Sequence, residues 1–516
     1  MTFSATQLMA LPAHFRSIGG RSPSSNAPGD CDIRRQAIGE GVRHGPVRPQ
    51  RTAEGDPEDR PGTGRETPKL LIWKGPTMTT PIAAVRTRVE LQKTRLPQMY
   101  GDIDFTLRPE RFTTDIDGAE RSIRPKLDLE RPRLLADTER VALIEAYTML
   151  GDNVADAYAA LIPEHGFRRL VEMLDQACDG GVDSVEGAPP ELRAFIEDME
   201  RIPEWVDMQS VERGARLVRN LAASVMPFVI RGGFVATFMN AYAALPMAIT
   251  GSLGTRTAGR RMKDTASFFA CTALPGALNR YGMGFKAAAK VRLMHSMVRF
   301  NILRRDGWDS SVYGIPIPQS DQMPAGLIPT FLLALKACEQ GRDRFTADEQ
   351  ARVEFARYRC YLLGLPEDLL PDSPQAIVEI MTTRHATLRK GFDDATCGAL
   401  VRATMEAYTE PDRSLRNRVR DRFERSSAKA FFVRAVLAGD RERAAGMGIE
   451  MTWGDWARAA AVFAFAGCQL AVYQALLWIP ATSAAADRRL VRKLERYLDR
   501  LGHAEFTTDA STYQHS

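Results

Sequence analysis

Apolar residues recur at three- and four-residue spacings through most of the chain after about the first 130 residues. The segments Leu143–Leu150, Ala155–Leu161 and Phe167–Leu174 each place their apolar side chains on one helical face. The alternation of apolar and polar residues that is typical of strands is nearly absent. Ile315-Pro-Ile-Pro318 is extended, but its prolines exclude a central strand. The pattern predicts an all-α fold, built as one large helical domain.

Two segments are unusually apolar. Ala459–Ile479 runs for 21 residues without a charge, which is long enough to cross a membrane. It also contains Gln469, a second glutamine and many alanines, which insert poorly. We therefore favour the other interpretation, a buried central helix. Ala222–Thr250 contains Pro227 and Pro246, which predict a series of broken core helices.

The last periodic segment, Asp487–Leu501, is strongly basic and amphipathic. A solvated terminal helix is the favoured interpretation, and an anchor on a membrane surface is the alternative.

Composition shifts divide the chain into four parts. Residues 1–77 are rich in Gly and Pro and lack apolar periodicity, so they predict a disordered extension. Met78 is an alternative start, in which case this extension is not translated. The remaining parts are an N-terminal arm over residues 78–130, the helical domain over 131–485, and a basic C-terminal helix and tail over 486–516.

Charge and cysteine content exclude several classes of protein. The net charge is only +5 over 516 residues, which argues against a dedicated nucleic-acid binder. The seven cysteines are scattered and form no C-x-x-C pair, which excludes a cysteine zinc site and covalent haem attachment. Hydrolase, P-loop and zincin motifs are also absent, and no Glu-x-x-His pair is available for a di-iron site.

His295 is the strongest candidate for chemistry. On a helix, Arg292 and Arg299 lie one turn to either side of it on the same face. Apolar bulk nearby comes from Leu293, Met294 and Met297. Such an imidazole suits a haem, whose iron it would bind and whose propionates the two arginines would pair. The alternative is a core histidine beside two surface arginines.

A second segment carries polar residues on an otherwise apolar helix. Arg261, Asp264 and Thr265 share one face with Phe268. Polar side chains on a core face are costly unless they are paired or functional. They suit the distal side of a dioxygen pocket, where hydrogen-bond donors polarise bound oxygen. An internal Arg–Asp pair that joins two helices is the alternative.

Six motifs, taken in order, resemble those of the rubber oxygenase (latex-clearing protein) and MpaB-type oxygenase family. They are Ile202-Pro-Glu-Trp-Val-Asp207, Arg261-x-x-x-Thr265, Val291-Arg-Leu-Met-His-Ser-Met-Val-Arg299, Trp308-Asp309, Gly314-Ile-Pro-Ile-Pro-Gln319 and Leu363-Gly-Leu-Pro-Glu-Asp-Leu-Leu-Pro371. The resemblance extends from about Ile202 to Pro371. It implies an all-α fold with a globin-like core that binds a non-covalent haem b.

Carried over by residue, the resemblance implies that His295 is the iron ligand and that Arg292 and Arg299 hold the propionates. Arg261 and Thr265 resemble the distal residues of the family, and together with Asp264 they are the candidate catalytic residues. Independently of the resemblance, His385 is a weaker candidate for a second iron ligand, because it is the other histidine in a core-like helix. Trp205, Asp207 and Asp309 are interpreted as structural, with the two carboxylates as helix caps.

The chain departs from the rubber-cleaving members at Asp264, where they resemble one another in carrying lysine. A carboxylate there would repel negative charge developing on dioxygen unless it were protonated or paired. Asn240–Ser252 also offers no acidic residue where those members carry a catalytic glutamate. We therefore do not expect polyisoprene to be the substrate.

Three functional hypotheses follow. The first is a haem-dependent oxygenase that cleaves C=C bonds of a hydrophobic, unsaturated isoprenoid or lipid-like substrate with dioxygen. The second is a non-catalytic haem protein, such as an oxygen or redox sensor or a haem store. The third is a helical scaffold without cofactor.

Met1–Ala13 lacks the basic and long apolar regions of a signal peptide, so we expect a cytoplasmic protein. Peripheral contact with a membrane stays open, and the sequence specifies neither the oligomeric state nor a redox partner.

Overall fold

The computed structural model describes residues 81–122, 125–305 and 307–502. This part of the chain is helical and contains no β-strand, so the all-α prediction is confirmed. Two isolated bridges, Phe112 to Leu388 and Ala119 to Arg389, join the N-terminal arm to the segment after helix α19. The expected disordered extension and the start at Met78 lie outside the described residues.

The helices of the first half of the described chain have the following bounds: α2 Ile82–Arg95, α3 Pro97–Tyr100, α4 Pro125–Asp128, α5 Arg131–Leu135, α6 Thr138–Thr148, α7 Asn153–Ala159, α8 Ile162–His165, α9 Phe167–Gly180, η1 Val182–Ser184, α10 Pro190–Glu200, α11 Met208–Ser224, α12 Met226–Val235, η2 Ala236–Phe238, α13 Ala241–Met247, η3 Ala248–Ser252, α14 Thr255–Cys271 and α15 Met283–Leu303.

The helices of the second half are α16 Ser310–Tyr313, α17 Gln319–Glu339, α18 Ala347–Leu362, η4 Glu367–Leu369, α19 Pro374–Ala386, η5 Asp394–Gly398, α20 Ala399–Glu406, α21 Leu415–Phe431, η6 Phe432–Val436, α22 Arg441–Gly446, α23 Trp453–Trp478 and α24 Pro480–Leu501.

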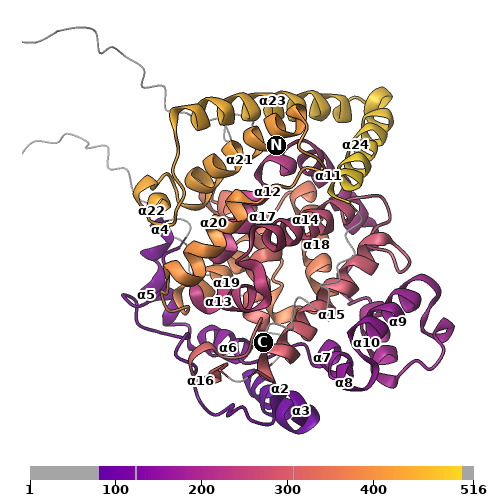
Figure 1. The fold of residues 1–516 in the computed structure, drawn as a ribbon, viewed down its shortest axis with the longest axis vertical. Helices are drawn as coiled ribbons and strands as arrows, with labels where there is room; N and C mark the ends of the chain where they lie inside the picture. Colours follow the sequence, from indigo (N-terminus) through magenta and orange to yellow (C-terminus); the bar gives the residue numbers. More distant parts are fainter. Residues whose placement is uncertain (1–80, 123–124, 306, 503–516) are drawn as a thin grey trace, which may run out of the picture. The chain divides into compact units, whose positions relative to one another are not determined.

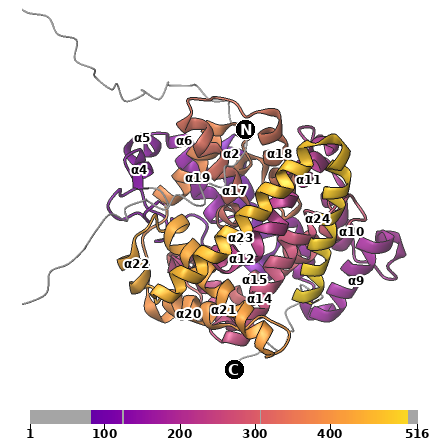
Figure 2. The same ribbon diagram turned by 90° about the horizontal axis from the view of Figure 1, so that it is seen from above.

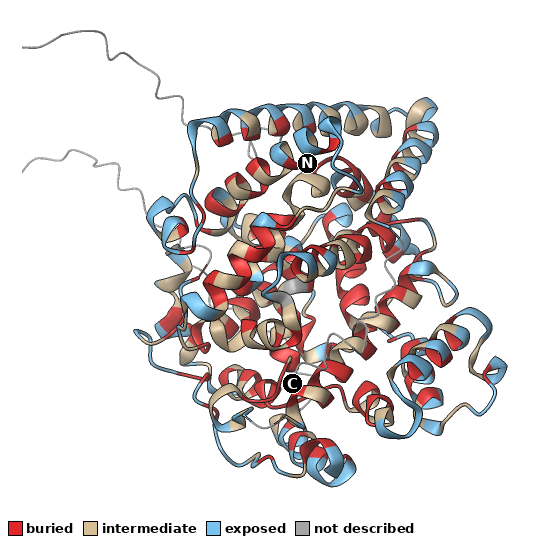
Figure 3. Cartoon of the chain, viewed as in Figure 1, coloured by how far each residue is buried: buried red, intermediate tan, exposed pale blue. Residues whose placement is uncertain are grey.

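Helix α15 lies in the interior and positions the candidate site. It packs against α7 and α9 on one side and against α14 and α18 on the other. The largest apolar core gathers around it, with Leu293, Met297 and Phe300 buried among residues of α7, α9, α10 and α18. Figure 3 shows its buried positions beneath the outer helices.

Several local predictions are confirmed. Helices α6, α7 and α9 form where the periodicity placed them, and Gly181 ends α9 with a φ of 85°. The apolar stretch over residues 222–250 is broken as expected, since α11 and α12 meet at a bend of 91°. Asp207 and Asp309 cap α11 and α16, each accepting a backbone N–H two residues on.

The interpretation of Ala459–Ile479 as a buried central helix is wrong. Within α23, only 11% of its most apolar window is buried, and the helix lies along the outside of the described chain, above α21 (Figures 1 and 3). Hydropathy reports only that a helix is apolar, and it does not distinguish a core from any other apolar environment. By length and composition, α23 is the one described helix that could cross a membrane on its own.

Helix α24 is amphipathic, as predicted, and it continues without interruption across residues 485 and 486. It buries Leu490, Leu494 and Tyr497 against α11 and α14. Figure 2 shows α24 beside α11. Arg219 of α11 is 1% exposed and donates to both carboxylate oxygens of Asp487, at 2.6 and 2.7 Å. This helix is therefore an integrated part of the helical domain.

One helical glycine tests the packing of α11 on α18, and a second glycine, in α12, serves as the comparison. A Cβ at Gly214 would overlap the carbonyl oxygen of Ala351, whereas a Cβ at Gly233 in α12 would meet nothing within 4 Å. We expect Gly233→Ala to stabilise the protein by about 0.5–1 kcal/mol through helix propensity. Gly214→Ala should instead destabilise it by about 1–3 kcal/mol, because α11 and α18 must separate. Urea unfolding of the two variants measures both effects, and equal midpoints would contradict this packing.

Candidate functional site

Two buried ion pairs hold α15 against its neighbours. The Arg292 guanidinium is 4% exposed; its Nη2 donates to Asp152 Oδ1 at 2.9 Å and lies 2.8 Å from Asp198 Oδ2. It also lies over the ring of Phe195, 5.1 Å from the centroid. Burial by itself raises the pKa of Asp152, but the Arg292 guanidinium brings it below its ordinary value. The pair is therefore ionised at neutral pH.

Two turns further along α15, Arg299 is fully buried and pairs with Asp156 of α7. It also donates to the carbonyl oxygens of Pro316, at 2.9 Å, and Ile317, at 2.6 Å. Asp156 accepts a further hydrogen bond from the Tyr100 hydroxyl at 2.6 Å. Burial raises the pKa of Asp156 above its ordinary value despite this pairing.

The two arginines expected to hold haem propionates thus already have carboxylate partners within the chain. The alternative of two surface arginines does not apply, since both side chains are buried. Gly364, in the last of the sequence motifs, packs directly on the Arg292–Asp152 pair. A Cβ there would overlap both charged groups, and the residue also has a φ of 85°.

His295 lies between these arginines, half-buried, and its Nδ1 is 3.0 Å from Gln322 Oε1. Gln322 Nε2 donates to Gln319 Oε1 at 3.1 Å, and Gln319 Nε2 donates to the carbonyl oxygen of Gly151 at 3.2 Å. A backbone carbonyl can only accept, so it fixes the orientation of both amides in turn. Gln322 therefore presents an acceptor to His295, whose Nδ1 carries the proton and whose Nε2 keeps its lone pair.

The protonation state of His295 agrees with this tautomer. Burial lowers its pKa to about 4, the hydrogen bond that His295 donates to Gln322 opposes that shift, and the charge of Arg299 adds to it. The imidazole is consequently neutral at physiological pH. A neutral imidazole whose Nδ1–H is held by an acceptor is the form that binds a metal through Nε2.

The predicted polar face belongs to α14, a neighbour of α15. Helix α14 packs against α15, and Arg261 is close enough to His295 to lower its pKa. Arg261 donates to the carbonyl oxygen of Thr250 at 2.9 Å and to the sulfur of Met247 at 2.9 Å, which fixes η3 and α13 beside it. Asp264 and Thr265 are half-buried on the same helix. Among the described residues, the Thr265 hydroxyl has no hydrogen-bond partner.

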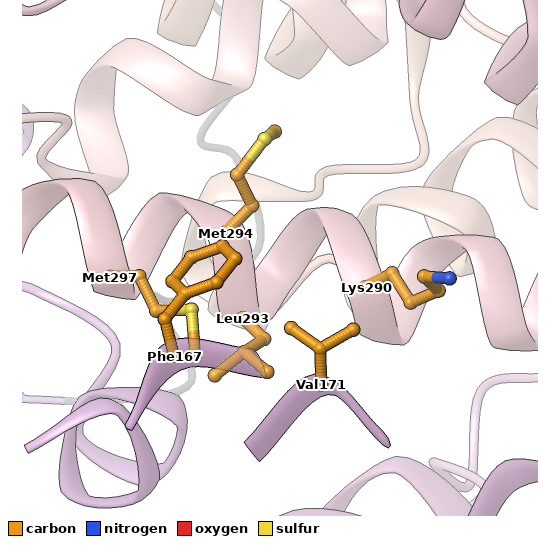
Figure 4. Close-up of a pocket in the computed structure, with 6 residues that line it drawn as sticks. All are labelled: Phe167, Val171, Lys290, Leu293, Met294 and Met297. Atoms are coloured by element: carbon orange, nitrogen blue, oxygen red, sulfur yellow. The ribbon is translucent and has the colours of Figure 1, made fainter. Parts of the chain in front are cut away.

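The apolar residues on the other side of α15 face elsewhere. Leu293 and Met297 each lie about 200° around the helix from His295. With Phe167 and Val171 of α9 they line a cavity of about 10 Å³, which has room for one water at most (Figure 4). The expectation that these side chains adjoin His295 is therefore wrong, because they belong to the core between α9 and α15.

His385 on α19 has a similar tautomer in a separate environment. Its Nδ1 lies 3.1 Å from the carbonyl oxygen of Met381, and burial lowers its pKa to about 4. The charged groups around it are Arg384, Arg131 and Asp128, none of which acts on His295. Within the described residues, no group of three or more His, Cys, Asp or Glu side chains lies together as a metal site.

The remaining motifs have structural roles. The guanidinium carbon of Arg357 lies over the ring of Trp205, 4.0 Å from the ring centroid. Arg357 Nε also donates to the carbonyl oxygen of Leu370 at 2.7 Å. Trp308 donates to the carbonyl oxygen of Gly314 at 2.9 Å, which holds the loop that Arg299 also binds. These contacts connect motifs that are far apart in the sequence.

Sequence reasoning missed Asp152, Asp156, Gln319 and Gln322. A signal for the first two was present, since two carboxylates at i and i+4 on an apolar helix share a face that needs basic partners. Gln319 ends the proline-containing motif, and Gln322 follows it by three residues. No sequence pattern indicated that they would meet His295.

Comparison with known proteins identifies related chains. Residues 222–468 match the family described as "ER-bound oxygenase mpaB/B'/Rubber oxygenase, catalytic domain". This span begins later than the motif region from Ile202 to Pro371 and extends well beyond its end. It contains α14 and α15 but not α7.

The chain is 28% identical over 238 residues to the rubber oxygenase of Streptomyces sp. (strain K30). That alignment covers 43% of this chain and 54% of the relative, so the chain spans about half the length of the curated relative it matches. A solved structure titled "Structure of Latex Clearing Protein LCP in the closed state" aligns with a TM-score of 0.49 and 20% identity, covering 68% of this chain and 91% of that one.

The tautomer of His295 can be measured directly in the protein without cofactor. We expect the nitrogen chemical shifts of labelled histidine to report protonated Nδ1 and unprotonated Nε2 for His295 from pH 8 down to about 5, because its pKa is lowered to about 4. In Gln322→Leu the acceptor is lost, so the imidazole should redistribute toward the Nε2–H tautomer. Gln209→Leu, at an exposed position, is the control. We call the hydrogen bonds from Gly151 through Gln319 and Gln322 to His295 the amide relay. A wild-type His295 protonated on Nε2 would contradict this relay.

Proposed function

This chain is a member of the ER-bound oxygenase MpaB/rubber oxygenase family, and we propose that it is a haem-dependent oxygenase. In this proposal, haem b is held through His295 and the substrate is hydrophobic and unsaturated. The single observation that carries the proposal is the relay from Gly151 through Gln319 and Gln322, which leaves Nε2 of a neutral His295 as the ligand atom.

The residues present fit a protein ligand of haem iron. The donor is a neutral imidazole of a fixed tautomer on a rigid interior helix, and its hydrogen-bonded Nδ1–H is the outer partner that ligating histidines need. The proposed partners of the propionates are not free in the same way as the Nε2 of His295. The charges of Arg292 and Arg299 are already neutralised by carboxylates of the chain, namely Asp152, Asp198 and Asp156. In their proposed role they share their charge between these carboxylates and the propionates.

The chain contributes orientation, polarity and exclusion of water. Gln322 acts as a positioning residue, because it fixes the ring plane and the tautomer of His295. When bound, haem would supply a redox-active iron that reacts with dioxygen. Thr265, whose hydroxyl is available, would donate a hydrogen bond to an oxygen atom of the bound reactant. Arg261 would add positive potential on the same side.

The proposed reaction is oxidative cleavage of a C=C bond to two carbonyl products. The relative from Streptomyces is named a rubber oxygenase, and here the substrate class is proposed as an isoprenoid or another lipid-like alkene. Asp264 stands where rubber-cleaving relatives resemble one another in carrying lysine, so we propose a substrate other than polyisoprene.

Asp264 is also the observation that favours a second candidate function, a non-catalytic haem protein. Unless it is protonated or paired, a carboxylate on the dioxygen side would oppose the development of negative charge, which would slow oxidation without preventing haem binding. The third hypothesis, a scaffold without cofactor, predicts that haem does not bind at all.

Absorption spectra of protein expressed with haem supply separate these candidates. We expect a Soret band that shifts with dithionite and carbon monoxide, and we expect His295→Ala to lose or displace it. Gln322→Leu should bind haem roughly 10- to 100-fold more weakly, because the outer partner of the ligand is removed. Gln209→Leu is the matched control. A folded but colourless wild type would leave only the scaffold.

The role of Thr265 is tested by turnover of unsaturated lipids, with carbonyl products measured by mass spectrometry. Thr265→Val keeps the shape of the side chain but removes the donor, so we expect kcat to fall by about 100-fold with an unchanged Soret band. Thr255→Val, at the exposed start of α14, is the control. Haem binding with no product from any alkene would favour the non-catalytic haem protein.

A further inference from the structure

Helix α23 turns a wide apolar face outward. Trp453 is 86% exposed, Phe465 is 55% exposed and Trp478 is 66% exposed, and Val472 and Ile479 are half exposed. Between these large side chains the outward positions are alanines and Cys468. At about 100° per residue, these positions cover an arc of roughly 140° that carries no charge. Such a continuous apolar surface is unusual on a monomeric protein in water.

The opposite face of α23 is fixed to the protein by polar contacts along its length. Near its start, Asp455 accepts from Ser426 of α21 at 2.8 Å. Further along, Asn220 of α11 donates to the carbonyl oxygen of Leu470 at 3.0 Å, and Lys493 of α24 binds Gln469. These contacts determine which side faces outward. They also prevent α23 from crossing a membrane without breaking its packing on α11, α21 and α24.

A basic groove lies beside the N-terminal half of α23. Its volume is about 470 Å³, and its basic lining residues are Arg413, Arg418, Arg422, Arg425, Lys429 and Arg458. Three carboxylates also line the groove: Asp421 pairs with Arg425, Asp455 pairs with Arg458, and Glu406 is exposed. Arg418 and Arg422 are exposed and have no carboxylate partner among the described residues. The groove therefore presents a surplus of positive charge next to the apolar face.

We propose that α23 and this groove form a docking surface for an anionic lipid bilayer. Helix α23 lies in the membrane plane, with its outward face at the boundary between headgroups and acyl chains. Its terminal Trp453 and Trp478 are of the residue type that prefers this boundary. Arg418 and Arg422 bind lipid phosphates in the groove. This inference does not depend on haem binding or on catalysis.

Charge favours a bilayer over a second copy of the chain on the same face. Both ends of α23 are flanked by basic residues, with the groove at its start and the exposed Arg488 and Arg489 shortly after its end. A two-fold pairing of two α23 helices, parallel or antiparallel, would bring these positive ends together. An anionic membrane neutralises both.

Cys468 provides a probe at the centre of the outward face. It is exposed, whereas Cys178, Cys271, Cys360 and Cys397 are buried and Cys338 is half-buried. With Cys31 and Cys338 changed to serine in the full chain, an environment-sensitive fluorophore can be attached to Cys468. Vesicles of phosphatidylcholine, with or without one-third phosphatidylglycerol, are then added. Doxyl groups at a shallow or a deep acyl position report the depth of the label.

We expect the fluorescence emission of the label to shift to shorter wavelength when anionic vesicles are added. The shallow doxyl group should quench this emission about twofold more strongly than the deep one. Because each basic residue near an anionic surface contributes about fivefold in affinity, Arg418→Gln with Arg422→Gln should weaken binding by about 30-fold. Trp478→Ser should weaken it by about tenfold. The charge-matched control is Arg86→Gln with Arg95→Gln on α2, which lies far from α23 in Figure 1. Unfolding midpoints confirm that every variant is folded.

Other outcomes would overturn the proposal. Equal binding to both kinds of vesicle, or equal weakening by the control pair, would remove the role of the groove. Stronger quenching by the deep doxyl group would indicate a spanning helix. The protein could instead fail to bind vesicles and form a concentration-dependent dimer in sedimentation that Trp478→Ser abolishes. That result would assign the face to a second copy of the chain. A monomer that binds neither vesicle would leave the face to another occupant.

Discussion

Two buried arginines on α15 pair with Asp152, the N-cap of α7, and with Asp156 within α7, and the candidate site depends on this interaction. A buried guanidinium is tolerated only when its charge and its donors are satisfied, and removing one partner would leave an uncompensated charge in the interior. Arg292 and Arg299 lie on one face of α15, so Asp152, Asp156 and Asp198 fix the rotation of this helix. That rotation decides what His295 meets.

With α15 held in this way, His295 faces Gln322 of α17 and not the apolar core against α9. The amide relay then determines which nitrogen carries the proton, because it ends at a backbone carbonyl that can only accept. Burial keeps the ring neutral. Three separate constraints, namely helix rotation, tautomer and charge, thus converge on one unprotonated Nε2. The proposed iron ligand is prepared by the chain before any cofactor binds.

The same physical logic operates at α23, with a different result. Polar contacts from α11, α21 and α24 commit one side of the helix to the protein, and the uncharged remainder has to face outward. An apolar helix that is anchored by polar groups on a single side cannot be a core element, because a core helix is covered by apolar neighbours all round. The basic residues around its two ends then give this surface a preference for negative charge.

The sequence by itself determined the helical class, the broken helices over residues 222–250, the caps at Asp207 and Asp309, and the shared face of Arg292, His295 and Arg299. Each of these follows from local spacing, since a helix turns by a constant angle and the side chains of proline and aspartate act on nearby backbone. The resemblance to its family was also contained in short motifs. Only the tertiary structure decided that the two arginines pair with Asp152 and Asp156, which lie 140 and 143 residues away, and that Gln322 is oriented toward His295. It alone decided that α23 is a surface helix. Periodicity states which residues share a face, whereas what that face meets depends on contacts between distant segments.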